Sequence, residues 1–301
     1  MEDDLRSLTA RIPALAAMGG APVAERLGGL TNRVYRLGDY CLRIPGAGTE
    51  EYIDRANEAV AARAAAAAGV APEVVHADPA SGVMVTRYLE GAVTMSPEAF
   101  RTLPGSPARA GEAFARLHRS GAVFPLRFEL FGMIESYLGV LAGKEVELPA
   151  GYHDVVAEAE AVRRALDARP VAPVACHCDP LCENFLDTGS RMWIVDWEYS
   201  GMNDPMWDLG DLSVEAQFGE SQDEEMLTAY FGGEAPAADR GRMVVHKAMC
   251  DLLWTLWGLI QLVNGNPADD FRAYADTRFA RCRALMATPD FARHLRAAAA
   301  G

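Results

Sequence analysis

The chain has 301 residues, half of them hydrophobic, which is enough for one large domain or two lobes with a substantial core. Its 28 basic residues against 42 acidic ones give a formal charge of −14, which argues against nucleic acid as a partner because phosphates need a basic surface. Residues 1–90 hold 9 basic and 12 acidic residues, so most of the acidic excess lies in the rest of the chain. A cationic ligand would suit that second part.

The start of the chain, MEDDLRSLTARIPALAAMGG, has an acidic head and no long apolar run, so we expect a short helix rather than a secretory signal. The most apolar later segment, Met249 to Val263, is interrupted by Asp251 and Gln261 and is too short to span a bilayer. Three of the six cysteines fall within seven residues, which suits reduced thiols. We therefore expect a cytoplasmic enzyme without membrane insertion, of uncertain oligomeric state.

The first ninety residues are predicted to form a small α/β unit. Two strand-like runs flank the Gly38-Asp39 turn, and a helix follows from about Ile53 to Ala68, where Gly69 stops it. Two more strands are expected in EVVHADPASGVMVTRYLEG, on either side of the Pro-Ala-Ser-Gly turn.

From Ser96 onward the hydrophobic period is mainly helical, with predicted helices near Pro97–Ser120, Tyr152–Ala168, Asp223–Phe231 and Arg240–Val263. The predicted architecture is therefore α+β and two-lobed. A sheet-rich N-terminal lobe would span residues 1–90, and a larger, mostly helical lobe would span residues 91–301.

The segment VACHCDPLCENFLDTGSRMWIVDWEYSG, residues 174–201, concentrates thiols, acids and a histidine. A metal site on Cys176, Cys178 and Cys182 is one interpretation, but Cys-x-Cys-x3-Cys is not the usual structural zinc spacing and no Cys-x-x-Cys pair completes it. Small buried thiols beside a loop are the simpler alternative.

The polar residues of this segment favour different chemistry. FLDTGSRMWIVD is two apolar runs around a turn, which predicts a hairpin that brings its ends together. Asn184 starts the first strand and Asp196 ends the second, so their oxygen atoms would meet, as a Mg²⁺ site requires. Asp179 lies on the loop leading in, where it could receive a proton from a hydroxyl. This is the division of labour in phosphoryl transfer by kinases.

The pattern His177-x-Asp179-x4-Asn184, followed by Asp196, resembles the choline kinase and aminoglycoside phosphotransferase families, small-molecule relatives of the protein kinases. The resemblance implies a protein-kinase-like fold with ATP and Mg²⁺ between the lobes. It also implies a structural role for His177, a catalytic role for Asp179, and Mg²⁺ binding by Asn184 and Asp196. Protein kinases have Arg where Cys178 stands, so regulation by a phosphorylated activation loop is not expected.

The nucleotide would need a phosphate-covering loop, a cation and an anchoring acid. In GGLTNRVYRL, Gly28, Gly29, Thr31 and Asn32 lie between strand-like runs, where small residues let backbone N–H groups approach phosphates, although the segment could also be an ordinary hairpin.

Arg43 would supply the cation that pairs with the α- and β-phosphates, and Glu58 on the next helix would steady it. The Arg and GGLTN both resemble choline kinases. Without the rest of the pattern, Arg43 would be a surface strand residue. Adenine would bond to backbone around Arg87 to Leu89, a strand end that could equally be plain core.

The acceptor should meet the helical lobe, where DWEYSGMNDPMWDLGDLSVEAQF resembles bacterial choline kinases most. That resemblance implies that Asp208 braces the catalytic loop and that Glu215 faces the choline ammonium.

Trp254 and Trp257 lie three residues apart and share a helix face, and we place Tyr274 with them. Aromatic faces hold quaternary ammonium groups by cation–π contacts of about 0.5–2 kcal/mol each. Spacing alone favours a structural role for both tryptophans in the hydrophobic core, whereas the resemblance favours a role in choline binding.

Choline is the acceptor we expect, with ethanolamine, thiamine or an aminoglycoside as alternatives. The acidic run ESQDEE would suit an aminoglycoside, although a solvated loop or helix start explains it more simply. A non-catalytic binding module is the other class of function, and it is disfavoured because no catalytic position is lost.

Overall fold

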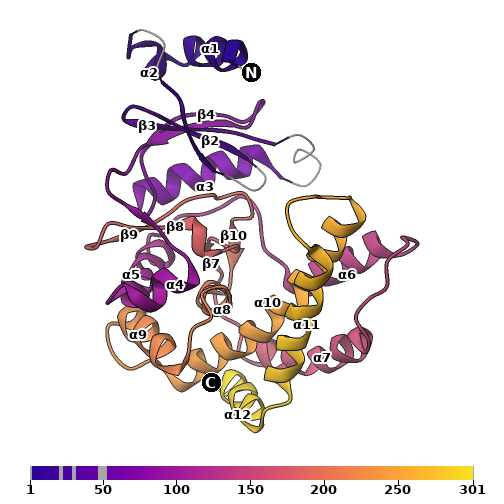
Figure 1. Cartoon of the computed structure of the whole chain (residues 1–301). Coiled ribbons are helices and arrows are strands. Elements are labelled where there is room, and N and C mark those ends of the chain that lie inside the picture. The colour runs from indigo at the N-terminus through magenta and orange to yellow at the C-terminus, as the bar shows by residue number, and fades with distance from the viewer. Residues whose placement is uncertain (1, 20–22, 29–31, 47–52, 301) are drawn as a thin grey trace.

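The computed structural model describes residues 2–19, 23–28, 32–46 and 53–300. The fold is two-lobed and protein-kinase-like, with a small sheet-rich N-terminal lobe and a larger, mostly helical C-terminal lobe (Figure 1). The N-terminal sheet is antiparallel in the order β1-β2-β3-β5-β4. Its strands are β1 (Glu25–Gly28), β2 (Arg33–Leu37), β3 (Tyr40–Ile44), β4 (Val74–Asp78) and β5 (Val83–Arg87).

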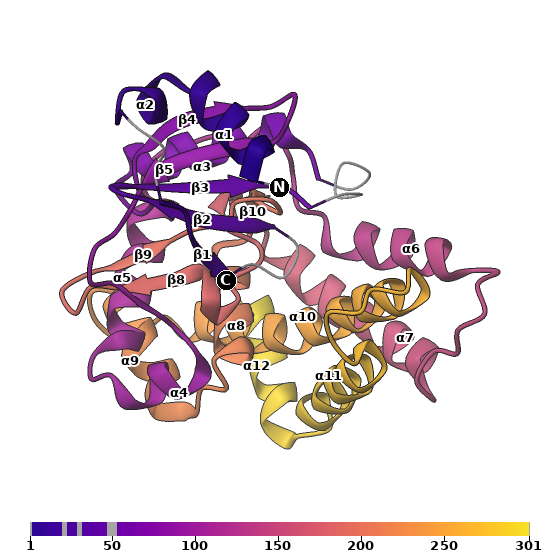
Figure 2. The same cartoon turned by 45° about the horizontal axis from the view of Figure 1, so that its top comes forward.

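Helices cover both faces of this sheet (Figures 1 and 2). On the face away from the helical lobe, α1 (Glu2–Arg11) and α2 (Pro13–Ala16) bury Ile12 and Leu15 against Leu37 and Leu42. On the other face lies α3 (Arg55–Ala67), whose alanines let it approach the strands closely. The sheet therefore lies between α1 and α2 on one face and α3 on the other, with α3 on the side of the second lobe.

The predicted elements of this lobe are confirmed. The turn at Gly38 joins β2 to β3, with Leu37 paired to Tyr40. α3 begins at a side-chain cap, because Asp54 accepts hydrogen bonds from the N–H groups of residues 56 and 57 at 2.9 and 3.0 Å. It ends before Gly69, whose φ of 72° suits glycine best.

Helices make up most of the C-terminal lobe. They are α4 (Pro97–Thr102), α5 (Ser106–His118), α6 (Leu130–Leu141), α7 (Tyr152–Ala168), α8 (Pro205–Glu215), α9 (Glu220–Phe231), α10 (Ala237–Val263), α11 (Phe271–Met286) and α12 (Pro289–Ala299). The prediction of one helix over Pro97–Ser120 is wrong. The chain leaves the helix at Leu103, and Gly105 has φ 74°, so Pro104-Gly105 divides the segment into α4 and α5.

α10 is the central helix of this lobe and packs against α8, α11 and α12. It is long and apolar enough to cross a membrane by length and composition, but 78% of its most apolar window is buried inside the protein. Its apolar character is therefore that of a core helix.

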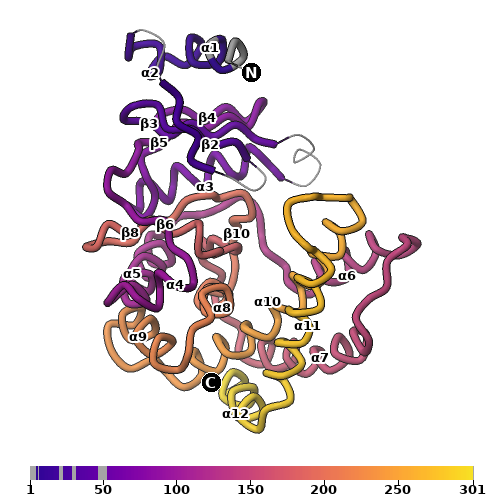
Figure 3. The backbone as a smooth tube through the Cα atoms, in the orientation of Figure 1, coloured from indigo at the N-terminus to yellow at the C-terminus, as the bar shows by residue number. Residues whose placement is uncertain are grey.

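Two small sheets line the inter-lobe side of the helical lobe. β7 (Val174–Cys176) pairs with β10 (Gly201–Asn203), and β6 (Val93–Thr94) pairs with β8 (Phe185–Asp187). Figure 3 shows β6, β8 and β10 below the N-terminal lobe. β8 and β9 (Met192–Ile194) form the predicted hairpin, with Phe185 opposite Ile194. Since β6 already belongs to the second lobe, we propose the lobe boundary at residues 90–91.

Candidate active site

A cleft of about 760 Å³ opens between the two lobes. Its walls come from β1 to β5 and α3 on one side, and from the β7–β10 region, α8, α10 and α11 on the other. Of the predicted site residues within the described chain, all except His177 and Asp208 line this cleft. Those two lie directly behind it. The sequence therefore predicted one continuous region, although its residues span more than two hundred positions.

Asp179 follows β7 on a segment with unusual backbone geometry. Cys178 has φ 68°, a left-handed conformation that side-chain-bearing residues seldom adopt. The Nε1–H of Trp207 donates to the Cys178 carbonyl at 3.2 Å. Nδ1 of His177 accepts from the Asp179 N–H at 3.4 Å, and its Nε2–H donates to the Val195 carbonyl at 2.9 Å. His177 thus joins the Asp179 loop to the strand end that precedes Asp196.

Asp208 lies beneath this segment, fully buried at the start of α8. Its two carboxylate oxygens accept the N–H groups of His177 and Cys178, both at 2.8 Å. His118 contacts the same carboxylate at 3.0 Å through Nε2 and Tyr230 Oη at 3.0 Å through Nδ1. Because a carboxylate can only accept, Nε2 donates to Asp208 and Nδ1 accepts from Tyr230. His118 therefore helps to fix Asp208, a role that the sequence analysis did not identify.

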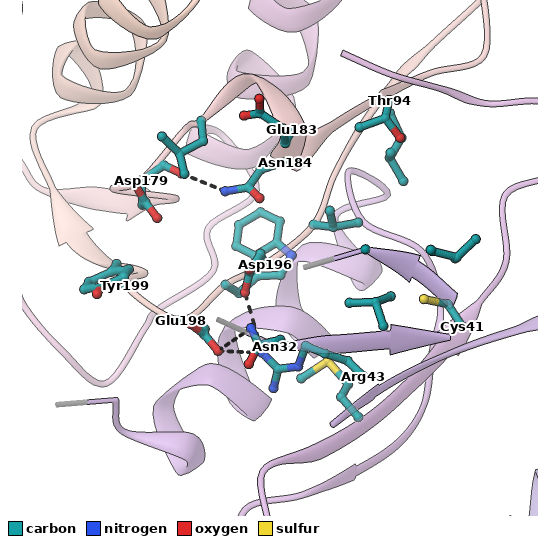
Figure 4. A pocket seen from close by; sticks show the side chains of 18 of the residues that line it. Asn32, Cys41, Arg43, Thr94, Asp179, Glu183, Asn184, Asp196, Glu198 and Tyr199 are labelled. Carbon is teal, nitrogen blue, oxygen red and sulfur yellow. Dashed lines mark hydrogen bonds and ion pairs between the residues drawn. The ribbon is translucent and has the colours of Figure 1, made fainter. Parts of the chain in front are cut away.

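Asn184 and Asp196 lie close together across the hairpin, as its register requires. Asn184 ends the short 3₁₀ turn η2 (Cys182–Asn184), and its amide N–H donates to the Asp179 carbonyl at 3.0 Å. Figure 4 shows Asp196 between this Asp179–Asn184 pair and Arg43. Asp196 has φ 66°, a second strained position at the site.

The donor set here fits a Mg²⁺ ion. Oδ1 of Asp196 is buried and accepts no hydrogen bond from the described residues. Burial, and then Glu198, raise the pKa of Asp196 to about 7. Burial, and then Asp196 and Glu215, raise the pKa of Asp179 to about 8. Oxygen ligands held among further acids are what a divalent cation requires.

Arg43 on β3 carries the cation expected on the nucleotide side. Both of its terminal nitrogens pair with Glu58 of α3, one of them at 2.8 Å, and Nη1 lies 3.5 Å from Asp196. Burial alone would lower the pKa of Arg43, but Glu58 and the other acids raise it. The guanidinium therefore stays charged while facing the cleft.

Glu198 is a site residue that the sequence analysis missed. Its Oε1 accepts from Arg43 at 2.9 Å, from Arg55 at 2.6 Å and from Asn32 Nδ2 at 3.0 Å. All three donors belong to the N-terminal lobe, whereas Glu198 follows β9. The only sequence signal was an acid two residues after Asp196.

The glycine-containing loop is only partly described. Gly29 and Thr31 lie outside the described residues. Gly28 ends β1 with φ 138°, and Asn32 is buried with Oδ1 lacking a hydrogen-bond partner among the described residues. Both line the cleft.

The strand end near the lobe boundary limits which N–H groups are free for a nucleotide. The N–H of Arg87 donates to the Glu73 carbonyl at 2.9 Å, and that of Tyr88 donates to the Asp39 carbonyl at 2.9 Å. Neither N–H is available to a nucleotide. Leu89 also lines the cleft.

The predicted aromatic residues come together at the α10–α11 end of the cleft. The rings of Trp254 and Trp257 are 6.5 Å apart at 88°, and those of Trp257 and Tyr274 are 5.7 Å apart. Tyr199 adds a fourth ring, 6.0 Å from Trp254. Trp254 belongs to the hydrophobic core and also lines the cleft, since only 4% of its surface is exposed.

Glu215 lines the same end of the cleft, but its carboxylate is already paired with a residue that the sequence analysis missed. Arg278 of α11 donates to Glu215 at 2.5 Å and lies 4.4 Å from the centre of the Tyr274 ring. The charge of Glu215 is therefore compensated within the chain. No sequence signal linked these residues, because 63 positions separate them.

The thiols give no support to a metal site. Cys176, Cys178 and Cys182 are buried and unbridged, and burial raises the pKa of each thiol. A protonated thiol is a poor metal ligand. Cys176 does approach His118 and Asp208, but those two already bond to each other.

Comparison with known proteins gives a consistent result. Residues 23–244 match the family model described as phosphotransferase enzyme family (APH). A crystal structure of a choline/ethanolamine kinase family protein from Mesorhizobium loti is 70% identical, with TM-score 0.93 over all of both chains.

Relatives with more specific names are more distant. Protein LicA of Haemophilus influenzae is 29% identical over 261 residues, which cover 81% of this chain and 75% of that protein. The structure of choline kinase LicA from Streptococcus pneumoniae is 25% identical, with TM-score 0.77 over 94% of this chain and 99% of that one. A structure of LicA in complex with AMP is also 25% identical, with TM-score 0.74 over 92% and 96%.

Proposed function

The chain belongs to the phosphotransferase enzyme family, within it to the choline/ethanolamine kinase family, and we propose that it transfers the γ-phosphoryl group of ATP to the hydroxyl of choline. The enzyme class is that of an ATP-dependent phosphotransferase with an alcohol acceptor. The choice of choline is our own proposal, and we place the reaction in the cytoplasm, where ATP is available.

Asp179 orients the acceptor hydroxyl and takes its proton. What supports this role is that Asp179 lines the same cleft as the predicted aromatic rings, and that Figure 4 shows it close to Asn184. Its raised pKa suits a group that must accept a proton near neutral pH. His177 and Asp208 keep the loop in place through the backbone contacts described above.

Arg43, steadied by Glu58, pairs with the α- and β-phosphates, and Gly28 and Asn32 lie on the same side of the cleft. Leu89 offers its backbone N–H to adenine. Asn184 and Asp196 would hold Mg²⁺, which neutralises phosphate charge when bound. Oδ1 of Asp196 supports this assignment, because it is buried, accepts no hydrogen bond from the described residues and has only the ion-pair contact with Arg43 at 3.5 Å.

The single observation that supports choline as the acceptor is the aromatic end of the cleft. A trimethylammonium group cannot donate hydrogen bonds, so it is recognised by ring faces and by negative charge. Trp254, Trp257 and Tyr274 meet there, in a lobe that carries most of the acidic excess. LicA of Streptococcus pneumoniae is named a choline kinase, and LicA was solved with AMP, which supports both substrates.

The test is ADP release by the purified protein with ATP and Mg²⁺, with choline, ethanolamine, thiamine and kanamycin in parallel. We expect choline to be preferred by at least about tenfold in kcat/KM. Preference for another acceptor would support the kinase assignment and reject choline as the substrate. The protein without an acceptor, and the Asp179→Asn variant with choline, are the controls for background hydrolysis.

A further inference from the structure

Four buried or half-buried acids surround the aromatic end of the cleft, and three of them have an assigned place. Asp251 is bound by two nitrogens of Arg281, at 3.0 and 2.5 Å. Glu215 is paired with Arg278, and Asp179 belongs to the reaction centre. The fourth acid, Asp211, has no Lys, Arg or His nitrogen within ion-pair distance among the described residues. Of these four acids, Asp211 has neither a cationic partner within the described part of the chain nor an assigned role.

Asp211 is nevertheless deeply buried, with 1% of its surface exposed. It lies on α8, one turn before Glu215. Its Oδ2 accepts a hydrogen bond from the indole Nε1–H of Trp254 at 3.2 Å, and its Oδ1 has no hydrogen-bond partner among the described residues. A buried carboxyl with an unused oxygen is costly unless a positive charge compensates it. Trp254 separates this carboxyl from the cleft.

We propose that Asp211 is a specificity-determining positioning residue, which selects a cationic acceptor by acting through the indole of Trp254. This inference rests on the proposed function. The hydrogen bond to Oδ2 fixes the plane of the indole at the cleft wall. Donation of the N–H to a carboxylate also makes the ring more electron-rich, which strengthens its attraction for a cation on its exposed part.

The charges of the neighbouring groups favour Asp211 over Glu215 in this role. Arg278 already neutralises Glu215 and covers one face of Tyr274, so the pair adds little net attraction for a cation. Burial, and then Glu215 and Asp179, raise the pKa of Asp211 well above its usual range, while Arg278 and the Trp254 hydrogen bond lower it. A cation arriving at the rings favours the ionised carboxylate.

The test compares two acceptors that differ only in charge. Choline and its uncharged analogue 3,3-dimethylbutan-1-ol are given to the wild type and to Asp211→Asn, which keeps an oxygen acceptor for the indole. We expect the KM and the Kd for choline to rise about tenfold in the variant. The KM for ATP, kcat at saturating choline and the Kd of the neutral analogue should change by less than about twofold. Equal losses on both acceptors, or no loss on choline, would overturn the proposal.

A second variant tests the route through the indole. Trp254→Phe keeps an aromatic face and removes the N–H, so Asp211→Asn should add less than about twofold to the choline Kd in that background. A full tenfold effect there would mean that Asp211 acts without Trp254. Asp276→Asn, an exposed acid on α11, controls for loss of one negative charge.

The binding measurements by calorimetry need no turnover, so they separate this inference from the proposed function. If the wild type prefers ethanolamine, the same comparison uses ethanolamine and propan-1-ol. If the wild type preferred a neutral acceptor, both the proposed function and the role of Asp211 would be rejected. Choline turnover with an unaffected Asp211→Asn variant would remove this one alone.

Discussion

Asp179 owes its position to residues of α8, of the turn η2 and of its own loop. Cys178 is held in a left-handed conformation because Asp208 accepts its N–H and Trp207 binds its carbonyl. His177 and Asn184 then fix the backbone on either side of Asp179. Such strain persists only where the surroundings impose it, and it is typical of reaction centres.

Removal of the Asp179 carboxylate should therefore affect the reaction and leave the fold intact. We expect Asp179→Asn to lower kcat by at least about 10²-fold, since general-base catalysis contributes about 10²–10⁴-fold. The KM values for ATP and choline should stay within about threefold. Steady-state ADP release over a range of both substrates measures this. A variant that keeps a tenth of wild-type kcat would exclude Asp179 as the base.

The aromatic site gives a second prediction at the residue scale. Trp257 is partly exposed in the cleft, so Trp257→Ala should fold normally. Loss of one cation–π contact of about 0.5–2 kcal/mol corresponds to a rise of about 2- to 30-fold in the KM for choline. The KM for ATP should not change. An unaltered KM for choline in a folded variant would remove Trp257 from the acceptor site.

At the scale of elements, α8 connects the structural and functional parts of the site. Asp204, Asp208, Asp211 and Glu215 follow one another at spacings of three or four residues, so they lie along one side of the helix. Asp204 caps the helix and binds Arg242 and His246 of α10, and Asp208 holds the Asp179 loop. Asp211 and Glu215 then reach the acceptor end.

The cap of α8 should make stability depend on pH. Burial alone would raise the pKa of Asp204, but His246 and then Arg242 lower it well below its usual value. A lowered folded-state pKa stabilises the protein above the unfolded pKa of about 4, and this contribution is lost as pH falls toward the folded pKa.

We therefore expect Asp204→Asn to lower the free energy of unfolding by about 3 kcal/mol at pH 7, because it leaves the buried Arg242 guanidinium without its carboxylate partner. The difference from the wild type should shrink at pH 3. Urea unfolding at both pH values measures it, with Asp276→Asn as the control. A difference independent of pH would show that the ion pairs do not stabilise α8.

The elements that the sequence predicted well are those defined by local pattern. The β8–β9 hairpin follows from two apolar runs around Thr188-Gly189, and α3 from its alanines and Gly69. What local pattern could not supply was pairing between distant positions. Arg278 meets Glu215 across 63 residues, and Glu198 meets Arg43 across 155, so neither partner could be identified from spacing.

Across the whole molecule, one carboxylate joins the two lobes at the reaction centre. Glu198 lies just past the β8–β9 hairpin of the helical lobe, and its Oε1 accepts from Asn32, Arg43 and Arg55 of the other lobe. Figure 4 shows Glu198 beside Asn32 and Arg43. The same residue, Arg43, also lies 3.5 Å from Asp196, so Glu198 links the position of the lobes to phosphate binding.

Glu198→Gln keeps the shape of this junction and removes its charge. We expect the KM for ATP to rise about tenfold, because Arg43 and Arg55 lose a shared anion and the lobes lose a charge-assisted tie. The KM for choline should change by less than about twofold, since the acceptor end lies wholly in the helical lobe. Glu129→Gln, an exposed acid of the helical lobe, should behave as the wild type. Equal changes in both KM values would mean that Glu198 supports the whole cleft rather than the junction with the nucleotide lobe.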